Sequence, residues 1–301
     1  MAKTLWRERN EALDPETDFV EIYQNLALYE FTWDLTQALS FALFRTYAVP
    51  SIGSLLDRTG AFTGATQKRY DDTALLLEAP FVHGFDSEAG RTALRRINQM
   101  HRAYDIADDD LRYVLSTFVV VPKRWLDDYG WRPLTETELR ASVNYYRHLG
   151  RHLGIKDIPE TYDDFMHLMD DYERAHFDFD AGGRRVADAT LRLLTTFYPR
   201  PLRRPVEVFS RALMDAPLLE AFAYAEPAPV VRRLSRAAMR ARARLLRHTP
   251  SNRRPTFTAD LRRIKSYPDG YRLAELGTFP VPGVAGCPVR HDARAGDAGR
   301  G

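Results

Sequence analysis

The stretch Ser87–Tyr104, SEAGRTALRRINQMHRAY, decides how this sequence folds. Its apolar positions follow at steps of three, four and three residues, as on one face of an α-helix: Leu94, Ile97, His101 and Tyr104. The sequence therefore predicts a helix from about 87 to 104 with a histidine on its apolar face. A neutral imidazole in such a place can donate its lone pair to a metal or to heme iron.

Helical spacing continues on both sides, and no run of alternating β-branched residues indicates a strand. The acidic run at 108–110 begins a second helix, which we expect to end near Pro122. Thr135 and Glu138 form a capping box for a third. Further helices are predicted at 159–179, 184–198, 205–215 and 230–248. The fold class is thus all-α, with one large helical domain at 1–280 and a Gly-, Pro- and Ala-rich tail at 281–301 that we expect to be disordered.

Composition and charge exclude several classes of protein. The 301 residues carry 43 basic and 41 acidic groups, and the net charge of +2 gives no overall field for nucleic acid. The single cysteine, Cys287, excludes an intrachain disulfide and a cysteine-based zinc site, and it fits a cytoplasmic setting. No signal peptide is visible in Met1–Asn10. No phosphate-binding loop, nucleophile elbow or dinucleotide fingerprint is present.

Two segments raise the question of membrane contact. The apolar stretch Leu35–Leu56 contains Arg45 and Pro50, so we interpret it as a core or surface-docking hairpin, not a membrane span. The segment 230–248 contains seven arginines. The favoured interpretation is a solvated surface helix whose arginine stems cover the core. The alternative is a basic amphipathic helix on an anionic membrane, which leaves peripheral membrane contact open.

Other histidines offer further candidate ligands. His176 also falls on an apolar helical stripe, three residues after Glu173. Glu-x-x-His is the motif of di-iron helical bundles, but these need two copies and the sequence holds one. His148 and His152 have the spacing of zinc-binding helices, without the glutamate of a metalloprotease. For each histidine, a core residue satisfied by a hydrogen bond is the competing interpretation.

Several motifs in order resemble one known family. They are Lys68–Thr73, Arg95–His101, Tyr113–Phe118, Pro122 with Trp125, Tyr129–Thr135, Gly154-Ile155 with Ile158-Pro159, Tyr172–Phe177, Tyr267–Tyr271 and Leu276-Gly277. Together, over residues 20 to 280, they resemble the MpaB branch of the family that contains the latex-clearing rubber oxygenases. The resemblance implies an all-α fold that encloses a b-type heme.

The resemblance also implies roles for individual residues. The single proximal histidine of the rubber oxygenases falls on His101, and their distal arginine and threonine fall on Arg69 and Thr73. Asp72 stands where those enzymes have a lysine, and their distal glutamate has no counterpart at 51–53. Arg96 and His176 lie in matching motifs and are predicted to contact the cofactor.

The function implied is a heme b-dependent oxygenase acting on a small lipophilic, alkene-containing, prenyl-type substrate with O2 bound opposite the proximal histidine. In it Arg69 would bind O2 or a heme propionate, Thr73 would assist, and Asp72 would handle protons if burial raised its pKa. The competing interpretation of Asp71, Asp72 and Thr73 is a cluster of ordinary helix caps. Alternative functions are a non-catalytic heme- or lipid-binding protein and a di-iron oxygenase. No obligate protein partner is evident from the sequence.

Overall fold

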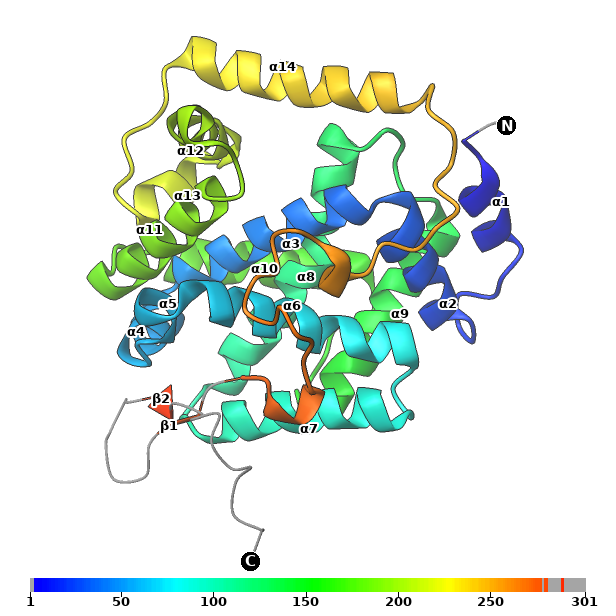
Figure 1. The fold of residues 1–301 in the computed structure, drawn as a ribbon, viewed down its shortest axis with the longest axis horizontal. Coiled ribbons are helices and arrows are strands. Elements are labelled where there is room, and N and C mark those ends of the chain that lie inside the picture. The colour runs from blue at the N-terminus through cyan, green and yellow to red at the C-terminus, as the bar shows by residue number, and fades with distance from the viewer. Residues whose placement is uncertain (1–2, 278, 281–287, 290–301) are drawn as a thin grey trace, which may run out of the picture.

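The computed structural model describes residues 3–277, 279–280 and 288–289, and helices dominate them (Figure 1). The predicted tail at 281–301 and Cys287 fall outside the described residues, apart from 288–289. The first part of the chain forms α1 (Leu5–Glu11), α2 (Phe19–Gln24), the π-helix η1 (Asn25–Glu30), α3 (Thr32–Tyr47), α4 (Pro50–Arg58), α5 (Ala61–Gly64), α6 (Thr66–His83) and α7 (Glu88–Arg102).

The remaining elements complete the all-α fold predicted from the sequence. They are α8 (Asp108–Tyr129), α9 (Glu136–His152), α10 (Tyr162–His176), α11 (Ala181–Thr195), η2 (Arg200–Leu202), α12 (Arg203–Leu213), α13 (Ala216–Ala221), α14 (Pro229–Leu246), η3 (Thr258–Asp260) and η4 (Leu273–Glu275). Two strands of two residues each, β1 (Phe279–Pro280) and β2 (Pro288–Val289), pair antiparallel.

The cap residues fix helix starts where the sequence predicted them. Ser87 accepts a hydrogen bond from the Gly90 backbone and begins α7. Thr135 and Glu138 form the predicted capping box of α9. The predicted end of α8 at Pro122 was wrong, since the helix continues to Tyr129. A proline inside a helix destabilises it by roughly 3 kcal/mol. Burial of Trp125 and Leu126 beyond Pro122 stabilises the longer helix by roughly 1.5–3 kcal/mol each, which offsets that cost.

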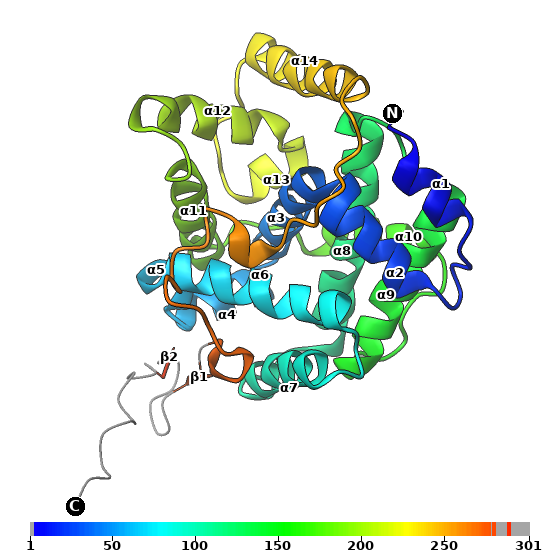
Figure 2. The same cartoon turned by 45° about the vertical axis from the view of Figure 1, so that its right-hand side comes forward.

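Helix α8 lies at the centre of the domain. It packs against α3, α9, α10 and α14, while α2 covers α9, α6 packs on α7, and α4 packs on α11. After α14, the chain returns as a mostly irregular segment, residues 249–277, that runs along α6 and ends beside α7 (Figures 1 and 2). We call residues 249–277 the C-terminal segment. Helices α3, α6 and α8 and this segment surround the region where the functional cavity lies.

Helix α3 belongs to the core, as the sequence predicted for the apolar stretch. Leu35, Ala38 and Ala42 are buried, and α3 meets α4 at a bend of 96°. Among the described residues no single helix has the length and apolar composition needed to cross a membrane. The bent pair α3–α4 meets that requirement by length and composition only.

Helix α14 lies on the outside of the domain (Figure 1). Its buried residues are Ser235, Met239 and Ala243. Three other apolar side chains of this helix face outward, with exposed fractions of 60% for Val230, 65% for Leu234 and 71% for Leu245. The favoured interpretation of this helix is therefore only partly right: the Arg242 guanidinium covers the Trp33 ring and pairs with Asp34, but an apolar stripe stays open to solvent.

Helices α4 and α11 approach so closely that only glycine fits at their crossing. A Cβ on Gly53 would lie 2.4 Å from the Tyr47 carbonyl oxygen, and one on Gly183 would lie 2.3 Å from the same atom. Both contacts are with backbone, which cannot move aside like a side chain. This crossing sets the position of α4 and α11, which both contribute to the cavity wall.

We expect Gly53→Ala to lower the free energy of unfolding by about 1–3 kcal/mol, the usual cost of overpacking. Gly64→Ala is the control, because a Cβ there meets nothing within 4 Å. Chemical denaturation of both variants measures the effect. Equal stability of the two variants would contradict the close crossing.

Candidate functional site

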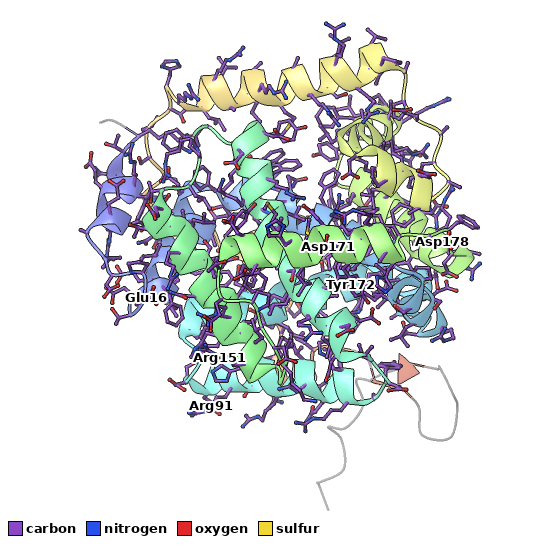
Figure 3. The ribbon with its side chains drawn as sticks, turned by 180° about the vertical axis from the view of Figure 1, so that it is seen from behind. Glu16, Arg91, Arg151, Asp171, Tyr172 and Asp178 are labelled. Carbon is purple, nitrogen blue, oxygen red and sulfur yellow. The ribbon has the colours of Figure 1, made fainter. Side chains whose placement is uncertain are left out.

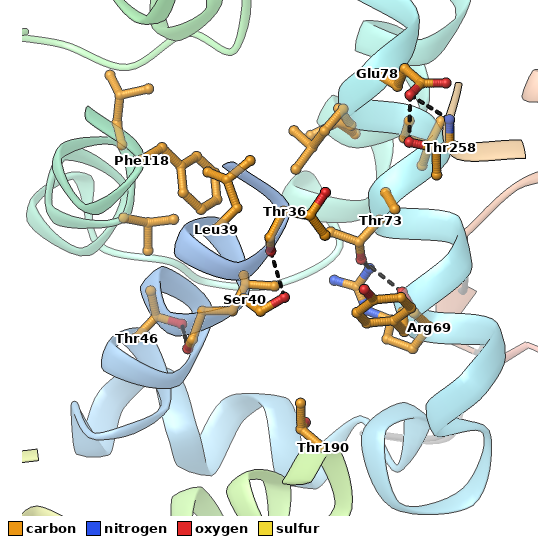
Figure 4. Close-up of a pocket in the computed structure, with 18 of the residues that line it drawn as sticks. Thr36, Leu39, Ser40, Thr46, Arg69, Thr73, Glu78, Phe118, Thr190 and Thr258 are labelled. Atoms are coloured by element: carbon orange, nitrogen blue, oxygen red, sulfur yellow. Dashed lines mark hydrogen bonds between the residues drawn. The ribbon is translucent and has the colours of Figure 1, made fainter. Parts of the chain in front are cut away.

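A cavity of about 350 Å³ lies in the middle of the domain, within the size range of small-molecule sites (Figure 4). Most of its wall is apolar, with Leu39, Leu43 and Phe118 among the residues that line it. Helices α3, α4, α6, α7, α8 and α11 supply many of its side chains, and α2, η1, α5, α9, some connecting residues and the C-terminal segment supply others. Such a wall favours a ligand with a large apolar body.

Helix α6 places two predicted residues on this wall. Arg69 and Thr73 are one turn apart and share a pair of hydrogen bonds: Arg69 Nη1 donates to Thr73 Oγ1 (2.6 Å), and Thr73 Oγ1 donates to the Arg69 carbonyl (2.7 Å) (Figure 4). The guanidinium also lies 5.2 Å from the Phe62 ring centre. Among the described residues no carboxylate lies within ion-pair distance of Arg69. Burial lowers the pKa of Arg69, yet an arginine stays charged near neutral pH.

His101, in the last turn of α7, lines the same cavity. Burial, and then the charge of Arg69, lower the pKa of His101 to about 4. The ring is therefore neutral near pH 7. In the described part of the chain its nitrogens have no hydrogen-bond partner. A neutral imidazole with a free lone pair in an apolar cavity is the chemistry that an iron ligand requires.

Asp72 does not line the cavity. It is fully buried on another face of α6, where it accepts hydrogen bonds from Lys68 Nζ (2.6 Å), the Tyr267 hydroxyl and the Gly277 amide (3.0 Å). Neighbouring Asp71 is equally buried and accepts from the Lys265 and Ser266 amides and the Ser266 hydroxyl. Both aspartates thus anchor the C-terminal segment to α6. They do not cap the start of α6, which begins at residue 66.

Arg96 and His176 do not line the cavity either. The Arg96 guanidinium donates to the Leu276 carbonyl at 2.7 and 3.0 Å, again holding the C-terminal segment. His176 is exposed at the end of α10, on the surface where Tyr172 also lies (Figure 3). Its ring stacks on Tyr172, and Nδ1 lies 2.9 Å from the Tyr172 carbonyl. The predicted buried face for His176 was wrong, because α10 buries Phe165, Met169 and Glu173 instead.

The residues considered for a non-heme metal site have other partners. Glu173 accepts from Arg45 Nε (2.6 Å) and from the Tyr113 hydroxyl (3.1 Å). The rings of His148 and His152 approach each other, with 3.1 Å between their Nε2 atoms, outside the cavity. Within the described residues no group of three or more histidine, cysteine or acidic side chains could hold a metal ion. The structure gives the di-iron alternative no ligand cluster there.

Glu78 and Arg263 are among the polar residues of the cavity wall that the sequence analysis missed. Glu78 continues the α6 face of Tyr70 and Ala74 at four-residue spacing, so helical periodicity could have found it. Its pKa is raised by burial, and it accepts from the Thr258 amide (2.7 Å) and hydroxyl. Arg263 comes from the irregular C-terminal segment, where no local pattern signals a cavity position.

The fold and the cavity define a helical protein with a deep apolar site for one small molecule or cofactor. The family model described as the catalytic domain of ER-bound oxygenase mpaB/B' and rubber oxygenase matches residues 32–248, and the chain belongs to this family. This confirms the resemblance found in the sequence. The C-terminal segment follows the matched region.

Individual relatives agree with this assignment. The ER-bound oxygenase mpaB' of Penicillium brevicompactum is 31% identical over 241 residues, 74% of this chain and 57% of the relative. The ER-bound oxygenase mpaB of the same fungus is 32% identical over 226 residues, 69% of this chain and 57% of the relative. The mpaB of Penicillium roqueforti (strain FM164) is 31% identical over 238 residues, 73% of this chain and 80% of the relative. The chain therefore matches little more than half the length of the first two.

We expect Asp72→Asn to lower the free energy of unfolding by about 1–3 kcal/mol, because a buried hydrogen-bonded charge loses its partners. Amide exchange in residues 264–277 should accelerate at the same time. Asp163→Asn, at an exposed aspartate of α10, is the control. If Asp72→Asn unfolds and exchanges its amides as the wild type does but loses activity, the anchoring role is contradicted and a chemical role for Asp72 is supported.

Proposed function

We propose that this protein is a heme b-dependent oxygenase in which His101 would hold the heme iron. The observation that carries the proposal is the neutral His101 imidazole in an apolar cavity, beside an arginine without a carboxylate partner. These residues fit the group: the imidazole offers a nitrogen lone pair, the apolar wall suits a porphyrin, and Arg69 offers a positive charge to a propionate or to bound O2. The names of the fungal relatives, oxygenases all, support the reaction class.

Bound heme iron would supply the binding and activation of O2. The protein's own contribution is to hold polar groups in fixed positions and to exclude water. The Thr73 hydroxyl is oriented by its donation to the Arg69 carbonyl, and it orients the Arg69 side chain in return. Apolar residues such as Leu111 and Val114 make the rest of the wall dry.

The substrate that fits this wall is small and lipophilic. Leucine and phenylalanine side chains cannot bind a charged or highly polar molecule along most of the surface. An alkene carried on a prenyl-type chain offers apolar surface throughout its length together with a bond that an oxygenase can attack. The competing proposal, a non-catalytic heme- or lipid-binding protein, predicts that such an alkene binds without oxygen-dependent product.

We expect wild-type protein from heme-replete cells to show a Soret band with about one b-type heme per chain by pyridine hemochrome assay. His101→Ala should lose the heme, since the imidazole that would hold the iron is removed. His148→Ala is the control, because this histidine lies outside the cavity. Full heme occupancy in His101→Ala would overturn the ligand assignment, and a colourless wild type that hemin cannot reconstitute would overturn the proposal itself.

We also propose that α14 contacts an anionic membrane surface. Its exposed stripe of Val230, Leu234 and Leu245 runs beside the exposed arginines Arg233 and Arg244. Apolar residues flanked by positive charge are the pattern of helices that lie in the membrane interface. The fungal relatives are ER-bound by name, which agrees with a membrane setting.

We expect the double variant Leu234→Ser with Leu245→Ser to bind vesicles of phosphatidylcholine and phosphatidylserine at least about tenfold more weakly than wild type, as two leucines leave the interface. Phe179→Ser is the control, since Phe179 is 53% exposed but lies away from α14. Flotation or sedimentation with the vesicles measures the binding. Equal binding of the double variant and wild type would exclude α14 as the contact.

A further inference from the structure

The C-terminal segment closes one side of the cavity, although it follows the family-matched region 32–248. Thr256, Thr258, Leu261 and Arg263 line the cavity from this segment. The segment lies along α6 in both ribbon views, and Thr258 meets Glu78 of α6 in the close-up (Figures 1, 2 and 4). A part of the chain beyond the matched region thus decides the chemistry of this wall.

Arg263 is held in a fixed position. Its carbonyl accepts a hydrogen bond from Gln67 Nε2 (2.8 Å), and the next residues are tied to Asp71 through the Lys265 and Ser266 amides. Its Nη2 donates to Thr36 Oγ1 of α3 at 3.1 Å. The guanidinium therefore bridges from the C-terminal segment to α3 across the cavity wall.

The Arg263 guanidinium has unused capacity to bind an anion. Its Nε is buried and has no hydrogen-bond partner. Among the described residues no carboxylate lies within ion-pair distance of it. The positive charge of Arg263 acts on the Glu78 carboxylate and favours its charged form. The Glu78 carboxylate accepts its hydrogen bonds from the Thr258 amide and hydroxyl, however, and not from Arg263. Arg263 is half-buried, and burying its Nε without a hydrogen-bond acceptor costs free energy, which a ligand carboxylate would offset.

Hydroxyl groups surround this position and suit a carboxylate. Thr36, Ser40 and Tyr70 line the cavity here, and the Arg263 charge acts on Tyr70. A guanidinium binds the two oxygens of a carboxylate with parallel hydrogen bonds. The Thr36 and Ser40 hydroxyls already donate to the Thr32 and Thr36 carbonyls, so the Tyr70 hydroxyl is the neighbouring group that can add a third hydrogen bond. Helix α8 contributes the apolar side chains of Leu111, Val114 and Phe118 to the same cavity.

We propose that Arg263 is a carboxylate-binding residue of the cavity, for a ligand with an acidic group on a large apolar body. The inference deepens the proposed function by naming a binding residue of the same site. Two sources share this chemistry: a propionate of the porphyrin, or the acidic head of a lipophilic substrate. In either case Arg263 fixes the orientation of the ligand, because it is the cationic group that the C-terminal segment brings to this wall.

The test compares acids with their esters in wild type and Arg263→Gln. One arm titrates hemin and hemin dimethyl ester into heme-free protein and reads the Soret shift. The other titrates oleic acid and methyl oleate, with affinity read by calorimetry. Each ester keeps the apolar body and removes the charge, so a general loss of folding would weaken acid and ester alike. Arg262→Gln, at the exposed neighbouring arginine, is the matched control, and Arg263→Lys tests charge without the guanidinium fork.

We expect Arg263→Gln to weaken binding of one acid about tenfold, the effect of losing a hydrogen bond to a charged group, with its ester unchanged. Selective loss with hemin assigns Arg263 to a propionate, and selective loss with oleic acid assigns it to the substrate. Arg263→Lys should recover part of that affinity. If Arg263→Gln binds both acids as wild type does, the proposal is overturned. The oleic acid arm remains decisive even if wild type binds no hemin, which would overturn the proposed heme function alone.

Discussion

Two adjacent buried carboxylates on α6 are the constraint on which the rest of the site depends. Asp71 and Asp72 are both 0% exposed, and a buried carboxylate is costly unless hydrogen bonds satisfy it. Most of their donors come from the far end of the chain, from residues 265, 266, 267 and 277. The C-terminal segment must therefore fold along α6 for these charges to be satisfied. Once it does, Thr258 and Arg263 become part of the cavity wall.

Helix α6 thus has two polar faces with different tasks. Arg69, Thr73 and Glu78 turn to the cavity, while Asp71 and Asp72 turn to the segment that closes it. Its charged groups are separated in the same way. Hydrogen bonds satisfy the carboxylates of Asp71 and Asp72, and the Arg69 guanidinium remains available to a ligand. Glycine-mediated contact of α4 with α11 fixes another part of the wall. The cavity is therefore held open by rigid elements, which is what a preorganised binding site requires.

A cavity of this size lowers stability while it holds no ligand, because the side chains around it lose packing contacts. Binding restores those contacts and stabilises the fold by mass action. For the same reason, His101 and the two cavity arginines lower the stability of the fold while they have no partner. The His101 imidazole has lost water from its lone pair, and the guanidinium groups of Arg69 and Arg263 have lost water from their N–H donors. The proposed heme would meet both needs, because it offers an iron to the histidine and carboxylates to the cations.

The sequence by itself predicted the all-α fold, most helices from residue 87 onward, the capping box at Thr135 and the family, and the resemblance assigned His101, Arg69 and Thr73 to one site. These features depend on spacing within one helix or on motifs in a fixed order, so they can be recognised without a structure. Tertiary packing alone decided that Asp72 faces the C-terminal segment, that His176 lies on the surface and that Arg263 reaches the cavity. The packing of α14 through Ser235, Met239 and Ala243, with Leu234 and Leu245 outward, was settled in the same way. Local periodicity defines the faces of a helix, but which face becomes buried depends on partners as far as 205 positions away, as between Asp72 and Gly277.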